Sequence, residues 1–225
     1  MRRFAVRALV AVVLAVVVGL SGVAIWAWHG FHAGGPLKSS VSLIVPKGAG
    51  VQEIGQLLQR SGVIENPHLF VLGARYTGMA RRMRAGEFAF SPNISMKQAA
   101  EHLVNGDMVR RRLTIPEGLL TREIISLVRA TDGLTGAVDS PGVDGIYLPE
   151  TYFFSYGDSR AGVLARMKSA MAEAAAKAWE SRGPDIAIKS LREAVILASI
   201  IEKETGIAAE RARVSAVFHN RLRRG

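Results

Sequence analysis

A long stretch of hydrophobic positions dominates the pattern at the start of the chain. No charged residue occurs between Ala8 and Trp28, a length that matches the roughly 20 apolar residues of a membrane-spanning helix. Three arginines precede the stretch, so the positive-inside rule places the N-terminus in the cytoplasm. Trp26 and Trp28 lie at its far end, where aromatic side chains favour the membrane interface. We expect a single-pass anchor; a cleaved signal peptide, with a shorter apolar core, is the competing interpretation.

The pattern becomes mixed after this stretch. Residues 31–40 are rich in Gly, Pro and Ser, which is the composition of a linker. Over residues 41–115, short apolar runs alternate with segments of helical spacing. We expect strands at residues 41–45, 86–92 and 108–115, and helices at residues 51–62, 66–76 and 95–106. Asn66 before Pro67, and Ser95 before Gln98, are typical helix starts. The sequence thus predicts a small α+β unit at residues 41–115.

Past Pro116 the pattern becomes mainly helical. We expect helices at residues 121–130, 159–182, 190–206 and 209–223, with a turn-rich segment at residues 131–145. Thr121 can cap the first of these helices, and Ser190 with Glu193 forms a capping box at the start of the third. The predicted fold class is therefore α+β: an N-terminal transmembrane helix, a small α+β subdomain and a mainly helical domain at residues 116–225.

Composition narrows the range of partners. The chain has 29 Lys and Arg residues against 19 Asp and Glu, a formal net charge of +10, which suits an anionic partner. Because everything after the apolar stretch is expected outside the cytoplasm, nucleic acid is not an expected partner. The absence of cysteine excludes disulfides and thiolate metal sites. The five histidines show no metal-ligand spacing, and no Gly-rich phosphate loop follows a strand. We expect neither a metal nor a cofactor.

The segment LASIIEKETG, Leu197 to Gly206, carries the main candidate for chemistry. An apolar run ends there in Glu202, the acid nearest the apolar part of the helix. Glu204 lies about 200° further round the helix, so the two carboxylates cannot face each other as an acid–base pair. Burial disfavours the charged form of a carboxylic acid, so an acid in this position can act as a general acid near neutral pH. The alternative is that these glutamates only mark the solvated end of a helix.

This segment, together with RARVSAVFHNRLRRG after it and GIYLPETYFF before it, resembles the endolytic murein transglycosylases, the YceG-like family. The resemblance covers essentially the whole chain. It implies a cytoplasmic tip and transmembrane anchor at residues 1–30, a linker at 31–40, a LysM-like subdomain at 41–115 and a catalytic domain at 116–225. Family members continue beyond the Asn-Arg-Leu triplet with a further segment, so the resemblance also implies a catalytic domain that is incomplete at its C-terminus.

The resemblance further implies an enzyme that cuts the glycan strands of peptidoglycan without water. Glu202 matches the family's catalytic acid and would protonate the oxygen between N-acetylmuramic acid and N-acetylglucosamine. The muramic acid 6-hydroxyl would then attack its own C1 and leave a 1,6-anhydro end. The implied location is the bacterial inner or plasma membrane, with the catalytic domain outside the cytoplasm. There the enzyme would release nascent strands close to peptidoglycan synthases.

Further residues could contribute to a sugar site. Tyr147, Glu150 and Tyr152 could line the cleft by stacking and hydrogen bonds, although the tyrosines could equally be core aromatics. Asn220 could contact the substrate or Glu202, or its helix could simply pack against the catalytic one. The arginine clusters at residues 81–84 and 110–112 suit acidic glycan strands but are also typical of solvated faces.

Two other classes of function stay open at this point. One is a non-catalytic membrane protein that binds peptidoglycan. The other is a peptidoglycan hydrolase that uses Glu150 with Glu202, because hydrolytic glycosidases usually need two carboxylates. The ends left on the glycan would distinguish the three.

Overall fold

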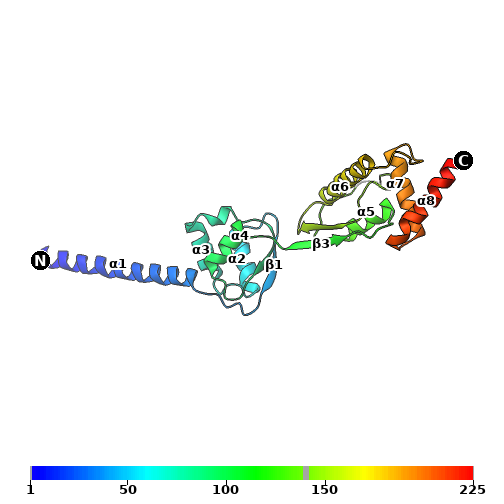
Figure 1. The fold of residues 1–225 in the computed structure, drawn as a ribbon. Helices are drawn as coiled ribbons and strands as arrows, with labels where there is room; N and C mark the ends of the chain where they lie inside the picture. The colour runs from blue at the N-terminus through cyan, green and yellow to red at the C-terminus, as the bar shows by residue number, and fades with distance from the viewer. Residues whose placement is uncertain (1, 139–141, 225) are drawn as a thin grey trace. The chain divides into compact units, whose positions relative to one another are not determined.

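The computed structural model describes residues 2–138 and 142–224, and it divides into two compact units, Met1–Val109 and Arg110–Gly225 (Figure 1). Met1, Gly225 and the middle of the expected turn-rich segment, residues 139–141, lie outside the described part. Unit 1 contains α1 (Arg2–His32), β1 (Val41–Val45), α2 (Val51–Arg60), α3 (Pro67–Tyr76), the short η1 (Met79–Arg81), β2 (Gly86–Phe90) and α4 (Met96–Asn105). Unit 2 contains β3 (Arg110–Thr114), α5 (Thr121–Ala130), β4 (Thr151–Ser155), α6 (Arg160–Glu180), α7 (Leu191–Glu204) and α8 (Ala208–Arg224). The fold is thus a mixture of helices and small sheets, as expected.

The division between the units differs from the sequence-based boundary at Pro116. The strand β3 was expected to complete the first unit, but it pairs with β4 in the second. The pairing is antiparallel, with a register that runs from Arg110 opposite Ser155 to Thr114 opposite Thr151. The strand β4 was not expected from the sequence at all. The alternation of apolar residues identified β3 as a strand but could not show which distant strand pairs with it. The sequence therefore placed the boundary between the two units too far along the chain.

The helix α1 has the length and composition of a membrane-spanning helix. Its segment Leu9–His32 has a mean hydropathy of 2.7, and every side chain from Leu9 to Trp26 is exposed. An apolar surface of this size is stable when lipid surrounds it, because the helix satisfies its own backbone hydrogen bonds. The helix is therefore compatible with the expected anchor.

Residues 31–40 are packed against unit 1, although their composition predicted a linker. Phe31 and Leu37 are 4% and 8% exposed. The backbone of Gly35 donates to Asn93 O and Ile94 O, and Asn93 N donates to Leu37 O over 2.8 Å. The glycines and proline of this segment therefore allow close packing rather than flexibility.

The core of unit 1 lies between its helices and the β1–β2 sheet. The two strands are antiparallel, with Val41 opposite Phe90 and Val45 opposite Gly86. Phe70 in α3 and Phe88 in β2 are fully buried. The predicted helix starts are confirmed: Asn66 Oδ1 accepts from Leu69 N, and Ser95 forms a capping box with Gln98.

Unit 2 has a separate core formed by α5, α6 and the β3–β4 sheet. Its fully or nearly fully buried side chains include Ile125, Val128, Phe154, Val163 and Met167. Thr121 was expected to cap α5, but it is the first residue of that helix and is 2% exposed. Its backbone N–H donates to Asp144 Oδ1 over 2.8 Å, and its hydroxyl donates to Val143 O. Thr121 thus fastens α5 to the loop before β4.

Candidate active site

The helix α7 carries the candidate acid and starts as the sequence predicts. Ser190 Oγ accepts from Glu193 N over 3.2 Å, which satisfies one free N–H of the first turn. Its apolar run is less buried than expected, because Leu197 is its one buried residue among those described. Ile196 is 49% exposed and Ile200 is 39% exposed. One side of α7 therefore packs on the unit, while the other presents apolar side chains to solvent.

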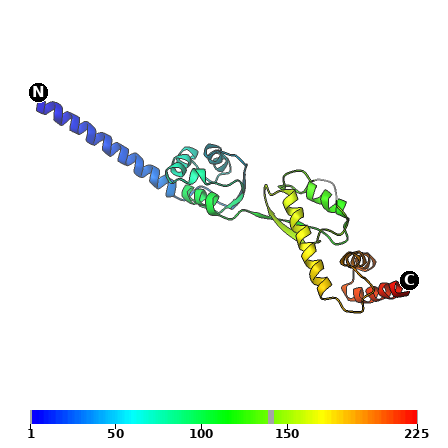
Figure 2. The same ribbon diagram turned by 90° about the horizontal axis from the view of Figure 1, so that it is seen from above.

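A large cleft within unit 2 runs along α7. It has a volume of about 1050 Å³, at the upper limit of the size of ligand sites, which is roughly 1,000 Å³. Figure 2 shows α7 and α8 together near the C-terminal half of α6. The lining comes from α6, α7, the segment between them, the loop that precedes α5 and the loop at residues 143–149. It includes Leu119, Asp144, Tyr147, Met171, Trp179, Ala198, Ser199 and Glu202. Ala198 and Ser199 share the lining with Glu202, as their helical spacing predicts.

Glu202 is held by an arginine from the next helix. Arg211 Nη2 lies 2.9 Å from Glu202 Oε2 and 3.2 Å from Oε1. The same nitrogen lies 3.5 Å from Glu117 Oε2, in the loop between β3 and α5. The Glu202 side chain is 29% exposed, against 60% for Glu117. One guanidinium is therefore shared by two carboxylates at the edge of the cleft.

A buried threonine turns the chain so that Arg211 reaches Glu202. Thr205, which is 8% exposed, ends α7 and begins the turn into α8. Its hydroxyl donates to Glu210 Oε2 over 3.0 Å and accepts from Ile207 N over 3.1 Å. Both bonds fix the first turn of α8 against the last turn of α7. Arg211, the residue after Glu210, is thereby directed back toward Glu202.

The loop that carries Glu117 also lies against the end of α7. A Cβ atom added to Gly118 would stand 3.3 Å from Lys203 Nζ. Gly118 has a φ of +76°, a conformation that glycine adopts without strain. Glycine at this position therefore allows the loop to turn and leaves room for the Lys203 side chain beside Glu117.

These contacts correct one expectation about the glutamates. Glu202 was expected in apolar surroundings, whereas it takes part in an ion pair and is partly exposed. Glu204 is exposed, and both glutamates are among the residues that line the cleft. The helical spacing could not show which of the two side chains α8 would meet.

The structure brings only one of the four proposed substrate-binding residues into the cleft. Tyr147 lines it with Glu202, whereas Glu150, Tyr152 and Asn220 are not among its lining residues. Glu150 is exposed, and its Oε1 accepts from Thr151 N over 3.0 Å. Asn220 is exposed on α8. These three residues remain candidates only for contacts outside this cleft.

The aromatic residues near β4 divide between core and surface. Phe154 is buried, while Phe153 is 47% exposed and lies beneath the Arg110 guanidinium, 5.3 Å from its ring centroid. Tyr152 packs against the core of unit 2, and its hydroxyl donates to Leu148 O over 2.8 Å. Burial, and next the negative charge of Glu150, raise the pKa of Tyr152, while Arg166 partly opposes them. Tyr152 therefore behaves as a structural aromatic in this unit.

Sequence reasoning missed the two partners of Glu202. Glu117 follows a predicted strand in the segment TIPEG, and no periodicity marks it as close to α7. Arg211 lies on the helix expected at residues 209–223, and nothing in its local pattern marks it as a partner of Glu202. His219 was also missed: its Nδ1 accepts from Ala187 N over 3.2 Å and ties α8 to the segment before α7. Each of these contacts depends on how α8 folds back, which the local pattern does not contain.

The chain is similar to a known protein family, to curated proteins and to a solved structure. A sequence model described as the YceG-like family matches residues 43–225. The endolytic murein transglycosylase of Streptococcus pneumoniae strain D39 is 24% identical, over 83% of this chain and 41% of its own. That of Bacillus subtilis strain 168 is 20% identical, over 83% of this chain and 60% of its own. A crystal structure of a YceG-like protein from Listeria monocytogenes is 22% identical, covers 83% of this chain and 71% of that one, and has a TM-score of 0.38. The chain thus spans 41% and 60% of the length of these two curated relatives, less than two thirds of each.

Proposed function

The chain belongs to the YceG-like family, and on that premise we propose that it is a membrane-anchored lytic transglycosylase acting on the glycan strands of peptidoglycan. Two kinds of observation support the proposal. The curated relatives carry the name endolytic murein transglycosylase. The observation that carries it in this chain is the placement of Glu202 on the wall of a cleft of about 1050 Å³. A cleft of that size has room for several sugar rings of a glycan strand next to Glu202.

In the proposed reaction Glu202 gives its proton to the oxygen between N-acetylmuramic acid and N-acetylglucosamine. The bond from that oxygen to C1 of the muramic acid breaks, and N-acetylglucosamine leaves with a free hydroxyl. The muramic acid 6-hydroxyl forms the new bond to C1, and the Glu202 carboxylate accepts the proton that this hydroxyl releases. The proton count is balanced and no water is consumed. Because the nucleophile belongs to the same sugar ring, its proximity to C1 is supplied by the substrate.

The ion pair with Arg211 imposes a condition on this reaction. Arg211 occupies both carboxylate oxygens of Glu202, whereas in the proposed reaction one of these oxygens must face the glycosidic oxygen of the sugar. The proposal therefore requires a bound sugar to weaken the contact between Arg211 and Glu202. Glu117 is placed to retain Arg211 when this happens, since the same Nη2 lies 3.5 Å from its Oε2. After proton donation, Arg211 can stabilise the Glu202 carboxylate again.

The rest of the chain has proposed roles that follow from the same premise. We propose that α1 anchors the protein in the inner or plasma membrane with its N-terminus in the cytoplasm. Unit 1 is proposed as a LysM-like subdomain that holds the glycan, and unit 2 as the catalytic domain. Anchoring would keep the reaction close to the membrane, where it would terminate nascent strands in the vicinity of peptidoglycan synthases.

A second candidate function rests on one observation, the shared arginine between Glu117 and Glu202. A hydrolase needs one carboxyl group to protonate the leaving oxygen and another to activate water or attack the sugar. The sequence pointed to Glu150 for the second role, but that residue is not among those that line the cleft. Glu117 is the carboxylate that stands beside Glu202, so a two-carboxylate hydrolase would use this pair.

The products distinguish these functions in one experiment. The full chain is incubated in detergent with purified glycan strands, and the released muropeptides are identified by mass spectrometry. We expect new 1,6-anhydro-muramic ends. New reducing ends in their place would establish the hydrolase, and the absence of new ends would leave a protein that only binds peptidoglycan.

A further inference from the structure

The last turn of α1 is locked onto unit 1. Phe31, 4% exposed, packs over Gly73 of α3, where an added Cβ atom would stand 2.4 Å from the Phe31 ring. One residue earlier, a Cβ atom on Gly30 would lie 2.9 Å from Leu69 Cδ2. Since residues 33–40 are also packed against the unit, no free linker separates the apolar helix from the unit. Wherever α1 sits, this end of unit 1 sits directly beside it.

The helix α3 presents an unusual surface at this end of the unit. Leu72 is 61% exposed and Tyr76 is 84% exposed, and Arg75 is exposed between them. Their spacing places all three on one face of the helix. Arg81 and Arg82 follow in η1 and just beyond it, and both are exposed. Figure 1 shows α3 on the side of unit 1 from which α1 leaves.

Three arginines, Arg75, Arg81 and Arg82, give this surface its positive charge. Among the side chains that the structure describes, neither Arg75, Arg81 nor Arg82 forms a salt bridge. Exposed leucine and tyrosine side chains with unpaired arginines are the composition of a surface that lies in a lipid headgroup layer. Tyrosine favours that layer because its ring is apolar and its hydroxyl is polar, and arginine is attracted by anionic phosphates.

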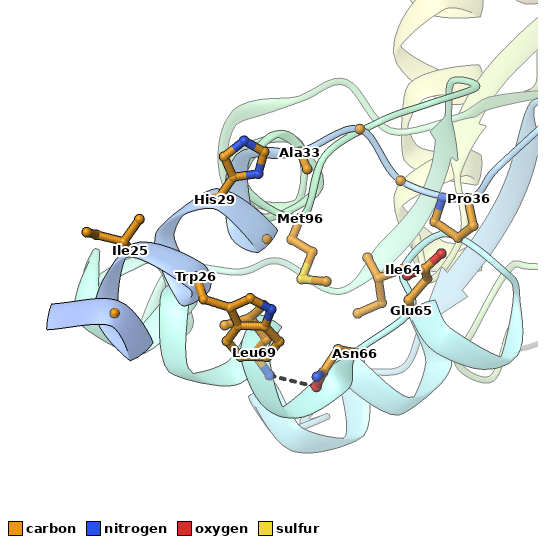
Figure 3. A pocket seen from close by; sticks show the side chains of 14 residues that line it. Ile25, Trp26, His29, Ala33, Pro36, Ile64, Glu65, Asn66, Leu69 and Met96 are labelled. Atoms are coloured by element: carbon orange, nitrogen blue, oxygen red, sulfur yellow. Dashed lines mark hydrogen bonds between the residues drawn. The ribbon is translucent and has the colours of Figure 1, made fainter. Parts of the chain in front are cut away.

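A groove beside α1 reaches α3 at Leu69 (Figure 3). It has a volume of about 560 Å³ and is lined by Gly22, Ile25 and Trp26 of α1 together with Ile64, Leu69 and Met96 of unit 1. Figure 3 shows Trp26 directed toward Leu69, with His29 on the turn that follows. His29, Glu65 and Asn66 give the groove a polar edge. Its α1 side belongs to the segment that is long and apolar enough to cross a membrane, so lipid would reach the groove directly.

We propose that unit 1 is seated on the membrane: the α3 face formed by Leu72, Arg75 and Tyr76 lies in the headgroup layer of anionic phospholipid, and a lipid chain fills the groove beside Trp26. The inference rests on the proposed anchoring by α1 and goes beyond it, because an anchor on a flexible tether would leave the unit free in solution. The arginine cluster that could contact acidic glycan is, in this arrangement, directed at lipid phosphate. Glycan would then have to approach unit 1 from another side.

The test uses the natural absence of cysteine. Single cysteines are introduced into the full chain as Thr77→Cys, next to the α3 face, and as Ser42→Cys, exposed on β1, and each carries the same environment-sensitive fluorophore. The protein is inserted into vesicles of phosphatidylcholine alone or with phosphatidylglycerol, and headgroup nitroxides serve as quenchers. We expect quenching at position 77 to exceed that at position 42 by about threefold or more, as interfacial burial requires. We also expect the difference to grow with phosphatidylglycerol.

Two further measurements separate the possible failures. A label at Val16→Cys must be quenched by acyl-chain nitroxides. If it is not, α1 is not inserted, and both the anchoring by α1 and the contact of unit 1 with the membrane are overturned. If the label at position 16 is quenched but the labels at positions 77 and 42 are quenched equally, α1 is inserted but the α3 face does not lie in the headgroup layer. Replacing Arg75, Arg81 and Arg82 by Gln should remove the dependence on phosphatidylglycerol, and an unchanged dependence would overturn their role in binding lipid phosphate.

Discussion

Arg211 on α8 holds Glu202 on α7 through both carboxylate oxygens, at 2.9 and 3.2 Å from one guanidinium nitrogen. The contact joins the ends of two consecutive helices, and it places the candidate acid at a defined position on the cleft wall. Because Glu117 contacts the same nitrogen, the arginine can move between two carboxylates without losing its partner. The geometry of the site therefore depends on a residue that supplies no proton itself.

Replacing Arg211 by Gln tests this dependence. The change removes the positive charge between two neighbouring carboxylates, so Glu202 is no longer held against the cleft. We expect turnover to fall by about tenfold or more, since misplacement of a catalytic group is costly. The free energy of unfolding should change by no more than about 1 kcal/mol, because the pair is partly exposed. Arg213→Gln, an exposed position on the same helix, is the matched control for kinetics and thermal unfolding. Full activity in Arg211→Gln would remove this residue from the site.

Thr205 at the corner between α7 and α8 is expected to act on both stability and turnover. Thr205→Val keeps the side-chain shape but leaves Ile207 N without its acceptor and Glu210 without its donor. We expect unfolding to become easier by about 1–2 kcal/mol, and turnover to fall because α8 no longer directs Arg211. Thr205→Ser retains the hydroxyl and should restore most of both. Equal stability and turnover in the Val and Ser variants would show that the hydroxyl is unimportant.

Gly73 should be intolerant of a side chain, although it lies within a helix. Alanine at an exposed helical position gains about 1 kcal/mol over glycine. Here the new Cβ atom would meet the Phe31 ring at 2.4 Å, so α1 and α3 must move apart at a cost of about 1–3 kcal/mol. We expect Gly73→Ala to lower the unfolding temperature of unit 1 in micelles. Gly19→Ala, where the new atom meets nothing within 4 Å, should not, and the same effect in both variants would contradict the packing argument.

The raised pKa of Tyr152 predicts that the folded chain loses stability at alkaline pH. Burial and the charge of Glu150 raise the pKa of Tyr152 above its ordinary 10.0. Between pH 10.0 and the raised pKa, the folded chain keeps the Tyr152 proton and the unfolded chain releases it. Stability is therefore complete below pH 10 and falls as pH rises through the raised pKa. We expect Tyr152→Phe to flatten this fall, at a cost of about 1 kcal/mol near neutral pH for the lost bond to Leu148 O.

A companion variant checks the cause of that pKa shift. Burial is the larger cause of the raised pKa, and Glu150→Gln removes the smaller one, so it should shorten the pH range over which Tyr152 contributes to stability. The free energy of unfolding of the wild type and the two variants is measured by chemical unfolding at a series of pH values above about 9. Parallel curves for the wild type and Tyr152→Phe would mean that the hydroxyl ionises equally in both states.

Features set by nearby residues could be predicted from the sequence, and features set by distant pairing could not. Asn66, Ser95 and Ser190 start their helices as expected, because capping involves groups only a few residues apart. The partner of β3 was missed because Thr151 to Ser155 follow it only after a helix and a long loop. The same limit explains the site: helical spacing placed Glu202 on a small-residue face, but the approach of Arg211 depends on the Thr205 corner.

The most direct test of the account compares Glu202→Gln with Glu204→Gln in the full chain. Both variants keep the side-chain shape and remove one titratable group, and release of 1,6-anhydro muropeptides is followed by mass spectrometry. Loss of a general acid costs roughly 10²–10⁴-fold in rate, so Glu202→Gln should nearly abolish the anhydro ends while Glu204→Gln retains most of them. Normal turnover in Glu202→Gln would contradict the account, whether or not Glu204→Gln is inactive.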